Sequence, residues 1–380
     1  WAGVCLVGVL VLGGWAATLP EHRGSFFVFW HQVVRVGAAL SGTGFMVGFM
    51  TLALPRLLDR VEGRGFVPFI AVRHVRASKS GFLTVISGLS IAGVAVSAFA
   101  LCAVVSIMGG FGADLKRKIL GNNAHMKIEA GAHGGFEGVD DLLTDLRLLK
   151  GVKAATPVTA GEAMASSSSN TAGTIVRGIE TTSIGSVIDL VQNIEVGKFE
   201  YLDEPAKLAD LPADEVIGIS TGGEIFLKGP RVKSWLRRDL DDDVSAAAEP
   251  VYPGIVVGRE LAKTLHVYVG DEVTLVAPLG DLGPMGVLPR SRKFRVAAIF
   301  YSGMYEYDSS HLYMKRDDAQ EFLDLRGKTT AVEVKLDDAE LVGAVRPELE
   351  ALVKRHATAL AREDMKIRDW KELNKNLFSA

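Results

Sequence analysis

The sequence predicts a membrane-anchored α+β protein, in which transmembrane α-helices precede a large mixed α+β domain. Three observations lead to this fold class. The 380 residues are 48% hydrophobic, with a mean hydropathy of +0.22, yet 23% of them are charged. The stretches without any Asp, Glu, Lys or Arg lie early in the chain, at Trp1–Pro20, Val36–Pro55 and Ser80–Ala113. The later, polar part holds β-rich runs and helical patterns, so it is predicted to form a separate domain.

The charges divide unevenly along the chain. Residues 1–111 hold eight of the 42 Lys/Arg and three of the 45 Asp/Glu, a net charge of +5, which leaves −8 for the rest. Nucleic-acid binding needs basic side chains to neutralise phosphates, so this acidic domain argues against that class. Aliphatic residues are too plentiful for a disordered chain. Cys5 and Cys102 both lie in apolar stretches, which argues against a disulfide scaffold.

The segment Phe82–Met108 is the clearest candidate for a membrane span. It contains 13 Phe, Leu, Ile or Val residues and no charge, so its insertion is favoured by about 5 kcal/mol. Six of the eight early Lys/Arg residues lie between Pro55 and Ser80, directly before it. By the positive-inside rule, that basic segment is cytoplasmic. The chain is then expected to leave the cytoplasm at Phe82 and to place the later domain outside.

These patterns predict the order of the parts. A cleaved signal peptide is the weaker interpretation of Trp1–Leu19, because the chain begins with Trp and lacks an early basic region. We also expect the chain to be a fragment of a longer protein. The expected parts are two N-terminal transmembrane helices within 1–55, a basic cytoplasmic or interfacial helix at 56–81, a transmembrane helix at 82–111, an outer domain at 112–375 and the start of a further transmembrane helix at 376–380.

The outer domain is expected to be α+β because strand and helix patterns do not alternate strictly. The residues between 201 and 253 are rich in acids and alanine and predict a surface insertion. The expected strands are His125–Glu129, Thr174–Ile179, Ile255–Val257, Val273–Val276, Phe294–Phe300, His311–Met314, Val332–Leu336 and Met365–Ile367. The expected helices are 139–149, 259–266, 317–325 and 338–355, the last with Asp337 or Asp338 as N-cap.

No pattern in the sequence predicts catalysis. Gly327-Lys328-Thr329 resembles the end of a phosphate-binding loop, but Phe322 stands where that loop needs its first glycine. The eight histidines lack metal-ligand spacing. Asp241, Asp242 and Asp243 are better explained as a solvated charge run, and Ser166–Ser169 as a flexible loop. The sequence therefore predicts a protein that is not an enzyme, with neither catalytic nor metal-binding residues.

One segment, residues 278–293, has an unusual composition. Prolines at 278, 284 and 289 alternate with glycines and apolar residues, and Arg290, Arg292 and Lys293 follow them. Prolines stiffen a loop, which lowers the entropy that binding would cost. The segment predicts either a rigid, apolar, basic-tipped grip for a protein partner or an ordinary long hairpin folded onto its own domain.

Several motifs together resemble one known family. Ser106-Ile107-Met108-Gly109-Gly110-Phe111, Val257-Gly258-Arg259-Glu260-Leu261, and Phe300 to Asp308 resemble parts of the permease subunits of lipoprotein-releasing (Lol-type, LolC/LolE) ABC transporters. These belong to the MacB/FtsX-like superfamily. The resemblance covers residues 66–380, and Trp370, Asn374, Leu377, Phe378 and Ala380 resemble the approach to the family's second span.

The resemblance implies a function and a set of partners. The chain would be a non-catalytic, multi-pass subunit in the bacterial inner membrane, with its large domain in the periplasm. It would extract acylated lipoproteins and pass them to a periplasmic carrier. It would bind no cofactor itself, because ATP and Mg would be used by a separate cytoplasmic ATPase. The implied partners are that ATPase, a second permease copy or paralogue, the carrier, the lipoprotein and membrane lipid.

The resemblance also assigns roles to named residues. Segment 278–293 would correspond to the family's carrier-binding hook, and the outer end of the span to the region that admits lipid. Simple lipid-facing packing is the alternative for the latter residues. The implied carrier-binding residues are Pro278, Leu282, Pro284, Met285, Gly286, Leu288, Pro289, Arg290 and Arg292. The implied lipid-cavity residues are Val105, Met108 and Phe111.

The chain departs from the family in its two extra N-terminal spans and in the insertion at 201–253. A related permease for export or mechanotransmission would share the architecture without needing the Pro284-Met285 loop. A membrane-anchored adaptor is a third possibility, which predicts no effect of its loss on lipoproteins. A periplasmic enzyme is the weakest alternative, because no base, nucleophile and orienting residue are apparent.

Overall fold

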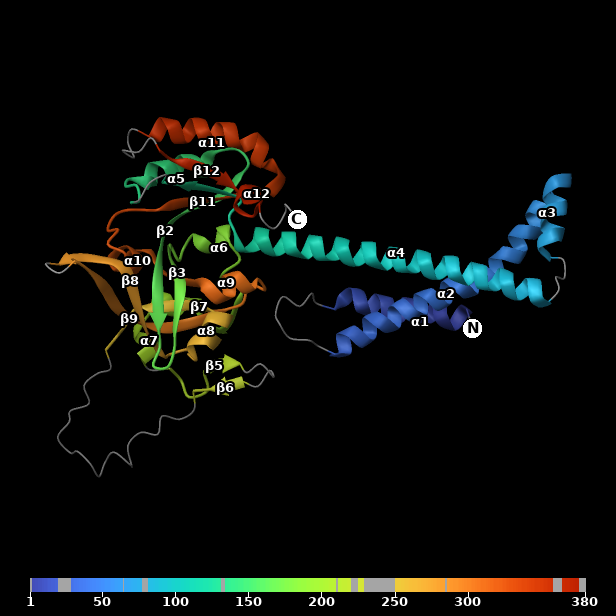
Figure 1. Ribbon diagram of the computed structural model, residues 1–380, viewed down its shortest axis with the longest axis horizontal. Helices are drawn as coiled ribbons and strands as arrows, with labels where there is room; N and C mark the ends of the chain where they lie inside the picture. The colour runs from blue at the N-terminus through green and yellow to red at the C-terminus, as the bar shows by residue number, and fades with distance from the viewer. Residues whose placement is uncertain are drawn as a thin grey trace, which may run out of the picture. The chain divides into compact units, whose positions relative to one another are not determined.

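A computed structural model describes residues 2–19, 29–63, 65–76, 81–130, 134–209, 211–219, 225–228, 250–283, 286–357 and 364–375. The chain divides into two compact units, Trp1–Gly112 and Ala113–Ala380 (Figure 1). The second unit begins at Ala113. The first unit holds most of the apolar helices, and the second holds the α+β domain.

The first unit is almost entirely helical in its described residues. Its helices are α1 (Ala2–Thr18), α2 (Phe29–Glu62), α3 (Phe66–Arg76) and most of α4 (Gly81–Asn122). Among the described residues, α2 and α4 are long and apolar enough to cross a membrane, whereas α1 is a shorter apolar helix of 17 residues. The two long apolar helices and the α+β domain confirm the predicted fold class.

Helix α4 differs from the expected span in its length. The helix does not end near residue 111 but continues to Asn122, for 42 residues in all. At 1.5 Å per residue it is about 63 Å long, roughly twice the thickness of the hydrocarbon core of a bilayer. The charged residues after 113 permit this continuation, because Lys, Arg, Leu and Ala all favour helix. Its last residues therefore belong to the domain.

The domain is built on one ten-stranded mixed sheet in the described residues. The strand order is β12-β1-β11-β2-β3-β10-β7-β9-β4, and β8 pairs with β2 and β9. Two of the neighbouring pairs, β3 with β10 and β7 with β9, are parallel, and the others are antiparallel. The strands are β1 (Met126–Glu129), β2 (Val152–Ser166), β3 (Thr171–Ile179), β4 (Ile194–Gly197), β7 (Gly254–Gly258), β8 (Glu272–Gly283), β9 (Gly286–Phe300), β10 (His311–Lys315), β11 (Ala331–Leu336) and β12 (Lys366–Asp369).

Short helices and one small sheet complete the domain. The helices are α5 (Val139–Leu148), α6 (Ile184–Val187), α7 (Ala206–Ala209), α8 (Arg259–Leu265), α9 (Tyr305–Ser310), α10 (Arg316–Phe322), α11 (Val342–His356) and α12 (Trp370–Leu373), with 3-10 turns η1 (Phe199–Leu202) and η2 (Ala339–Leu341). Strands β5 (Val216–Ile219) and β6 (Ile225–Leu227) pair with each other.

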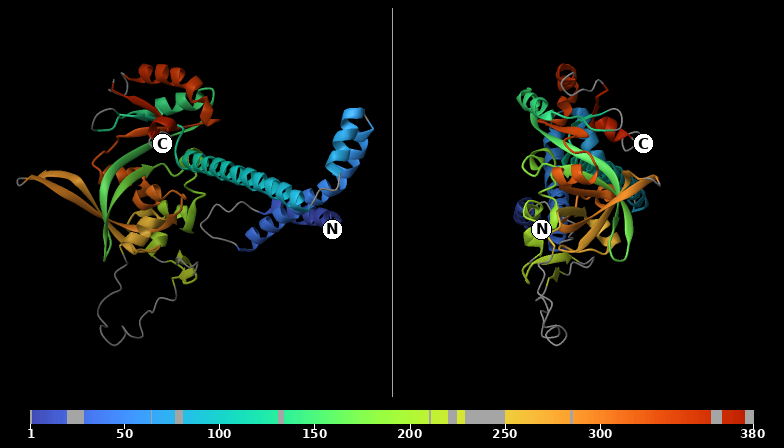
Figure 2. Two further views of the ribbon diagram at one scale, coloured as in Figure 1. Left: turned by 45° about the vertical axis from the view of Figure 1, so that its right-hand side comes forward. Right: turned by 90° about the vertical axis from the view of Figure 1, so that its left-hand side faces the viewer.

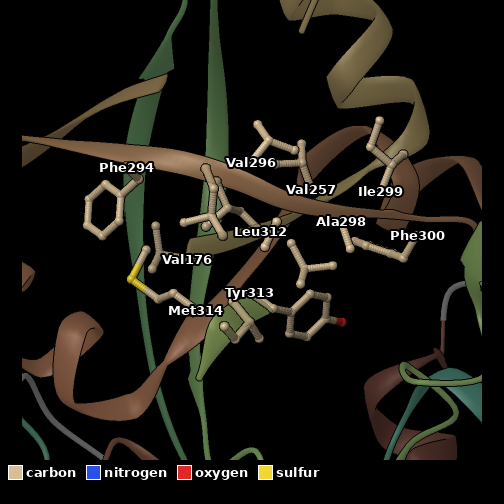
Figure 3. Packing of buried hydrophobic residues seen from close by; sticks show 14 of the residues in the cluster. Val176, Val257, Phe294, Val296, Ala298, Ile299, Phe300, Leu312, Tyr313 and Met314 are labelled. Atoms are coloured by element: carbon tan, nitrogen blue, oxygen red, sulfur yellow. The ribbon is translucent and has the colours of Figure 1, made fainter. Parts of the chain in front are cut away.

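The domain has two hydrophobic cores, one at each end of the sheet. Helices α5 and α11 lie over β1 and β11 (Figure 2). Together they form the smaller core, which also buries Ile119 near the end of α4. The larger core lies around β3, β7, β9 and β10, and Figure 3 shows Val176, Leu312 and Met314 gathered with Phe294 in it. Strand β2 runs through both, with Ala155 in the smaller core and Ala165 in the larger.

The structure corrects two of the expectations about the domain. The sequence does not predict strand β2, because this segment is rich in Ala and lacks the β-branched run that usually signals a strand. The region 201–253 is not wholly a surface insertion, since Tyr201, Leu202, Leu208 and Leu211 are buried in the larger core. Residues 229–249 of that region, including the three aspartates, lie outside the described residues.

Candidate functional site

The segment 278–293 forms a long antiparallel hairpin rather than a loop. Strands β8 and β9 pair from Glu272↔Arg295 outward to Gly283↔Gly286, with a register shift between Ala277 and Asp281. Such an irregularity bends a strand. In Figures 1 and 2 the orange ribbon of the hairpin extends away from the rest of the sheet. The segment is thus the long hairpin of the second interpretation, while its use as a grip for a partner stays a prediction.

The predicted carrier-binding residues are spread along this hairpin. Pro278 and Pro289 are exposed where it leaves the sheet. The backbone of Leu282, Gly286 and Leu288 lies in its outer pairs, where Asp281 faces Leu288 and Leu282 faces Val287. Pro284 and Met285, between Gly283 and Gly286 in the sequence, lie outside the described residues.

The two arginines do not lie where the sequence suggested. Arg290 and Arg292 are near the base of the hairpin, and their guanidinium groups face α10 instead of the tip. Arg292 lies 2.7 Å from Glu321 Oε2 and 3.4 Å from Asp318 Oδ1. Arg290 lies 3.4 Å from Asp324 Oδ1 and donates to the Glu321 carbonyl oxygen at 3.1 Å. The prediction of a basic tip is therefore wrong, because these charges are paired within the chain.

The structure joins two of the motifs that carried the family resemblance. Gly258 packs directly on the backbone of Asp308, where a Cβ would lie 2.2 Å from the carbonyl oxygen. The Asp308 carboxylate, which is buried, accepts the Ser302 amide at 2.8 Å. Burial raises the pKa of Asp308, although this hydrogen bond favours its charged form. The Arg259 guanidinium lies 3.7 Å from the centroid of the Tyr301 ring.

The same motif residues hold the end of α4. Asn122 donates to the Ser302 carbonyl oxygen at 3.2 Å and accepts from Asn193 at 2.9 Å. The Tyr307 hydroxyl donates to Asn123 Oδ1 at 3.0 Å. The last carbonyls of a helix have no partner inside it. Here Lys335 Nζ donates to the Leu120 oxygen at 2.6 Å and the Asp189 amide to the Gly121 oxygen at 2.9 Å.

The end of α4 is therefore fixed in the domain by hydrogen bonds and by the burial of Ile119.

Earlier along the helix lie the three predicted lipid-cavity residues, Val105, Met108 and Phe111. They are spaced by three residues and are 62%, 70% and 69% exposed. Side chains at this spacing line one side of a helix. This placement accommodates either lipid contact or lipid entry.

The serine segment 166–169 and the segment Gly327-Lys328-Thr329, which the sequence did not assign to catalysis, have structural roles. Ser167 and Asn170, in the turn between β2 and β3, donate to the Leu265 and Thr264 carbonyl oxygens at 2.6 and 2.7 Å. They cap the C-terminus of α8, so the expectation of a flexible serine loop is wrong. The amides of Lys328 and Thr329 donate to Leu325 and Phe136, which leaves them no capacity to hold a phosphate. In the described residues no group of three or more His, Cys, Asp or Glu could hold a metal.

Acid should destabilise the domain, because buried His125 and half-buried His311 are held in neutral form. Burial and Lys335 lower the pKa of His125 to about 4, and burial and Arg177 lower that of His311 to about 3. His125 Nδ1 accepts the Leu336 amide at 3.2 Å, which a protonated nitrogen could not do. An unfolded histidine gains its proton near pH 6.5. The free energy of unfolding should thus fall as pH drops from 6.5 toward 4, by up to about 1.4 kcal/mol per pH unit for each histidine.

Urea unfolding of the full chain in detergent at pH 7 and pH 5 would measure this loss. A His125→Gln/His311→Gln variant should lose less stability than the wild type over the same interval. The comparison isolates the contribution of the histidines. A buried carboxyl with a raised pKa, such as Asp308, makes the folded state more stable as pH falls, and it does so equally in the wild type and the variant. Equal pH dependence in both proteins would contradict the prediction.

No family model matches the chain. Over 320 residues it is 27% identical to the lipoprotein-releasing system transmembrane protein LolC of Neisseria meningitidis, which covers 82% of this chain and 62% of that protein. A protein of the same description from Xylella fastidiosa is 26% identical over 315 residues, with the same coverage. The chain thus spans about 62% of the length of the curated relatives it matches.

Two solved structures align with the chain at lower similarity. The extracellular domain of the noncanonic ABC-type transporter YknZ from Gram-positive bacteria is 12% identical, with a TM-score of 0.36, and covers 65% of this chain and 100% of that one. The periplasmic region of MacB from Actinobacillus actinomycetemcomitans is 14% identical, with a TM-score of 0.35, and covers 69% and 96%. The chain is similar to the LolC transmembrane proteins over 82% of its length, which confirms the resemblance that its motifs predicted.

Proposed function

We propose that this chain is a permease subunit of an ABC transporter that extracts lipoproteins from the inner membrane and hands them to a periplasmic carrier. ATP hydrolysis by a separate cytoplasmic subunit would drive motion of the domain. The observation that carries the proposal is the β8–β9 hairpin, which extends away from the domain in a chain similar to LolC. A stiff, protruding segment with apolar residues near its turn suits the grip of a partner that shields acyl chains.

The energetics of the task explain the partners. Each CH₂ group withdrawn from lipid costs about 0.8 kcal/mol, so several acyl chains cannot leave the membrane by thermal motion alone. The process needs an external motor and an apolar acceptor. We therefore propose three partners for this chain: an ATPase that uses ATP and Mg, a second permease copy or paralogue, and a periplasmic carrier. The chain would lie in the bacterial inner membrane with its domain in the periplasm.

Lipid would reach the transporter near the outer end of the apolar part of α4. Val105, Met108 and Phe111 present flexible or aromatic side chains on one side of the helix there, and all three are exposed. Such side chains can line a path for acyl chains without offering a polar group that would need a partner. We propose that they contact the acyl chains of the substrate.

Substitutions at Pro284 and Met285 should weaken carrier binding. The full chain in lipid nanodiscs is expected to bind the host's periplasmic lipoprotein carrier, as measured by surface plasmon resonance. Met285→Asp places a charge in an apolar contact, and Pro284→Gly removes the restraint on the turn. Each should weaken binding by at least about tenfold, because a buried unpaired charge and a lost preorganisation each cost more than 1 kcal/mol.

Leu148→Asp provides the control for this experiment. Leu148 is 80% exposed on α5, so the substitution adds the same charge to the domain surface away from the hairpin. Its binding should match that of the wild type. Absence of carrier binding by the folded wild-type chain would overturn the proposed function, as would correct sorting of outer-membrane lipoproteins after depletion of the protein.

The length of α4 favours a second candidate. A helix of 42 residues whose end is fixed in a folded domain suits any permease that transmits motion across the membrane. A related export or mechanotransmission permease is therefore the alternative. In that case the turn variants would retain full activity, and lipoproteins would be sorted normally without the protein.

A further inference from the structure

Helix α10 lies between the central sheet and the base of the hairpin. On the sheet side it is seated on two glycines. A Cβ at Gly178 of β3 would lie 2.3 Å from the Ala319 Cβ, and one at Gly161 of β2 would lie 2.7 Å from Leu323 Cδ2. Only the missing side chains allow this approach. The helix therefore rests directly on the sheet and cannot move closer to it.

On its other side, α10 meets one face of β9 at successive positions. Side chains two residues apart on a strand point to the same face, so Phe294, Arg292 and Arg290 form a row that leads outward along the hairpin. At the foot of the row, the rings of Phe294 and Phe322 pack edge to face with centroids 5.8 Å apart. Both rings are fully buried.

Further out, the contacts change from apolar to ionic. The Arg292 guanidinium lies 5.5 Å from the Phe294 ring centroid and reaches both Glu321 and Asp318. Arg290 reaches Asp324 and the Glu321 backbone. The two arginine side chains are only 25% and 31% exposed. An isolated surface ion pair contributes little, but two guanidinium groups that each reach two oxygen atoms restrain direction as well as distance.

The direction of the hairpin depends on this row. From Arg290 to the turn, each strand runs on for about five residues, or about 17 Å. A tilt of about 10° at Arg290 would therefore move the turn by about 3 Å, which is enough to displace a docked partner. Strand β8 is also paired with β2, but only as far as Val276. Beyond that point, the hydrogen bonds between β8 and β9 hold the two strands to each other and not to the rest of the sheet.

We propose that Arg290 and Arg292, with Asp318, Glu321 and Asp324, form a brace that fixes the direction of the hairpin and so positions it for its partner. The arginines are positioning residues, which act through the hairpin instead of by contacting the partner. This inference rests on the proposed function only for its consequence in carrier binding. The brace itself is a property of the domain.

The test exchanges the charges of the brace. Arg292→Glu should break it, and the double variant Arg292→Glu/Glu321→Arg should restore it with the signs reversed. Lys293→Glu is the matched control, because it makes the same charge change at the neighbouring residue, whose side chain lies on the opposite face and pairs with Glu272 at 3.1 Å. All variants are made in the full chain in nanodiscs, with both cysteines replaced by alanine.

The first readout needs no partner. Spin labels attached at Gly286→Cys and Leu148→Cys report the distance from the hairpin to α5, measured by pulsed electron paramagnetic resonance. The distance distribution should be narrow in the wild type, broad in Arg292→Glu, and narrow again in the double variant and in Lys293→Glu. A distribution that stays narrow in Arg292→Glu would overturn the brace.

The second readout is carrier binding. Arg292→Glu should weaken it by about tenfold, and the double variant should recover it. If the double variant regains the narrow distance distribution but not the binding, Arg292 contacts the carrier directly and its assignment as a positioning residue is wrong. If the wild type binds no carrier while the distances behave as expected, the proposed function fails and the brace stands.

Discussion

Replacing Arg177 by methionine should lower the free energy of unfolding of the domain by about 3–5 kcal/mol. Arg177 and Glu333 form a salt bridge inside the domain, and the two residues are 7% and 4% exposed. Burial alone would lower the pKa of Arg177, but the Glu333 carboxylate together with Tyr313 and Tyr307 outweighs burial, and the pKa is raised. Without the arginine, a carboxylate would remain buried without a countercharge.

The position of this pair explains why the loss should be large. Arg177 is on β3 and Glu333 on β11, and β2 lies between the two strands. In the sheet, Arg177 faces Ala160 and Glu333 faces Thr156, so the ion pair reaches across small residues of β2 on one face. One carboxylate oxygen of Glu333 already has no hydrogen-bond partner. The site therefore has little capacity to compensate for a lost guanidinium.

A double variant distinguishes charge from packing. Arg177→Met/Glu333→Leu removes both charges and should recover most of the lost stability, since apolar replacements of a buried pair are often neutral. Urea unfolding of the full chain in detergent, followed by hydrogen exchange at β3 and β11, would measure both variants. A cost below about 1 kcal/mol for the single variant would show that water reaches Glu333.

Replacing Phe294 by alanine should destabilise the domain by about 3–5 kcal/mol. Phe294 is 0% exposed and packs in the larger core against Phe322 and near Met314, as Figure 3 shows for the latter. Deleting the ring removes its transfer free energy and leaves a cavity that the surrounding strands cannot fill. The hairpin and α10 should both lose their anchor.

Tyr305→Ala is the control for this prediction. Tyr305 is an aromatic residue that is 72% exposed, so its replacement should change stability by less than about 0.5 kcal/mol. The same urea unfolding measurement serves for both variants. Hydrogen exchange should rise in β9 and α10 for the Phe294 variant alone, and equal stability of the two variants would contradict the assignment of Phe294 to the core.

Local patterns were enough to predict several elements. Helix α11 follows from apolar residues at helical spacing, of which Val345, Leu349, Leu352 and Val353 are buried, whereas Leu341 is 38% exposed. Asp338, one of the two predicted caps, caps the 3-10 turn η2 instead, where it accepts the Glu340 amide at 3.0 Å, and Leu341 stands at the N-cap of α11. Strands β7, β10 and β11 are apolar runs of the length that a buried strand needs. In each case the signal lies in neighbouring residues.

Other features have no local signal. Strand β2 is recognisable only from its neighbours, because small Ala, Thr and Gly side chains are what its central position between β3 and β11 requires. The prolines and glycines of 278–293 suggested a loop, yet backbone pairing across the register shift makes it a hairpin. Burial of Arg177 and Glu333 also depends on strands that are far apart in sequence.

The sequence by itself determined the apolar helices, the acidic α+β domain and the likeness to LolC, because composition, hydropathy and short motifs are local properties of the chain. Only the tertiary structure decided where charged side chains point. In the sequence, Arg290 and Arg292 follow an apolar segment. In the fold, they form ion pairs with Asp324 and Glu321, in and just after α10, because Gly161 and Gly178 allow this helix to rest on the sheet. Such an approach depends on residues more than a hundred positions away, which no pattern around the arginines encodes.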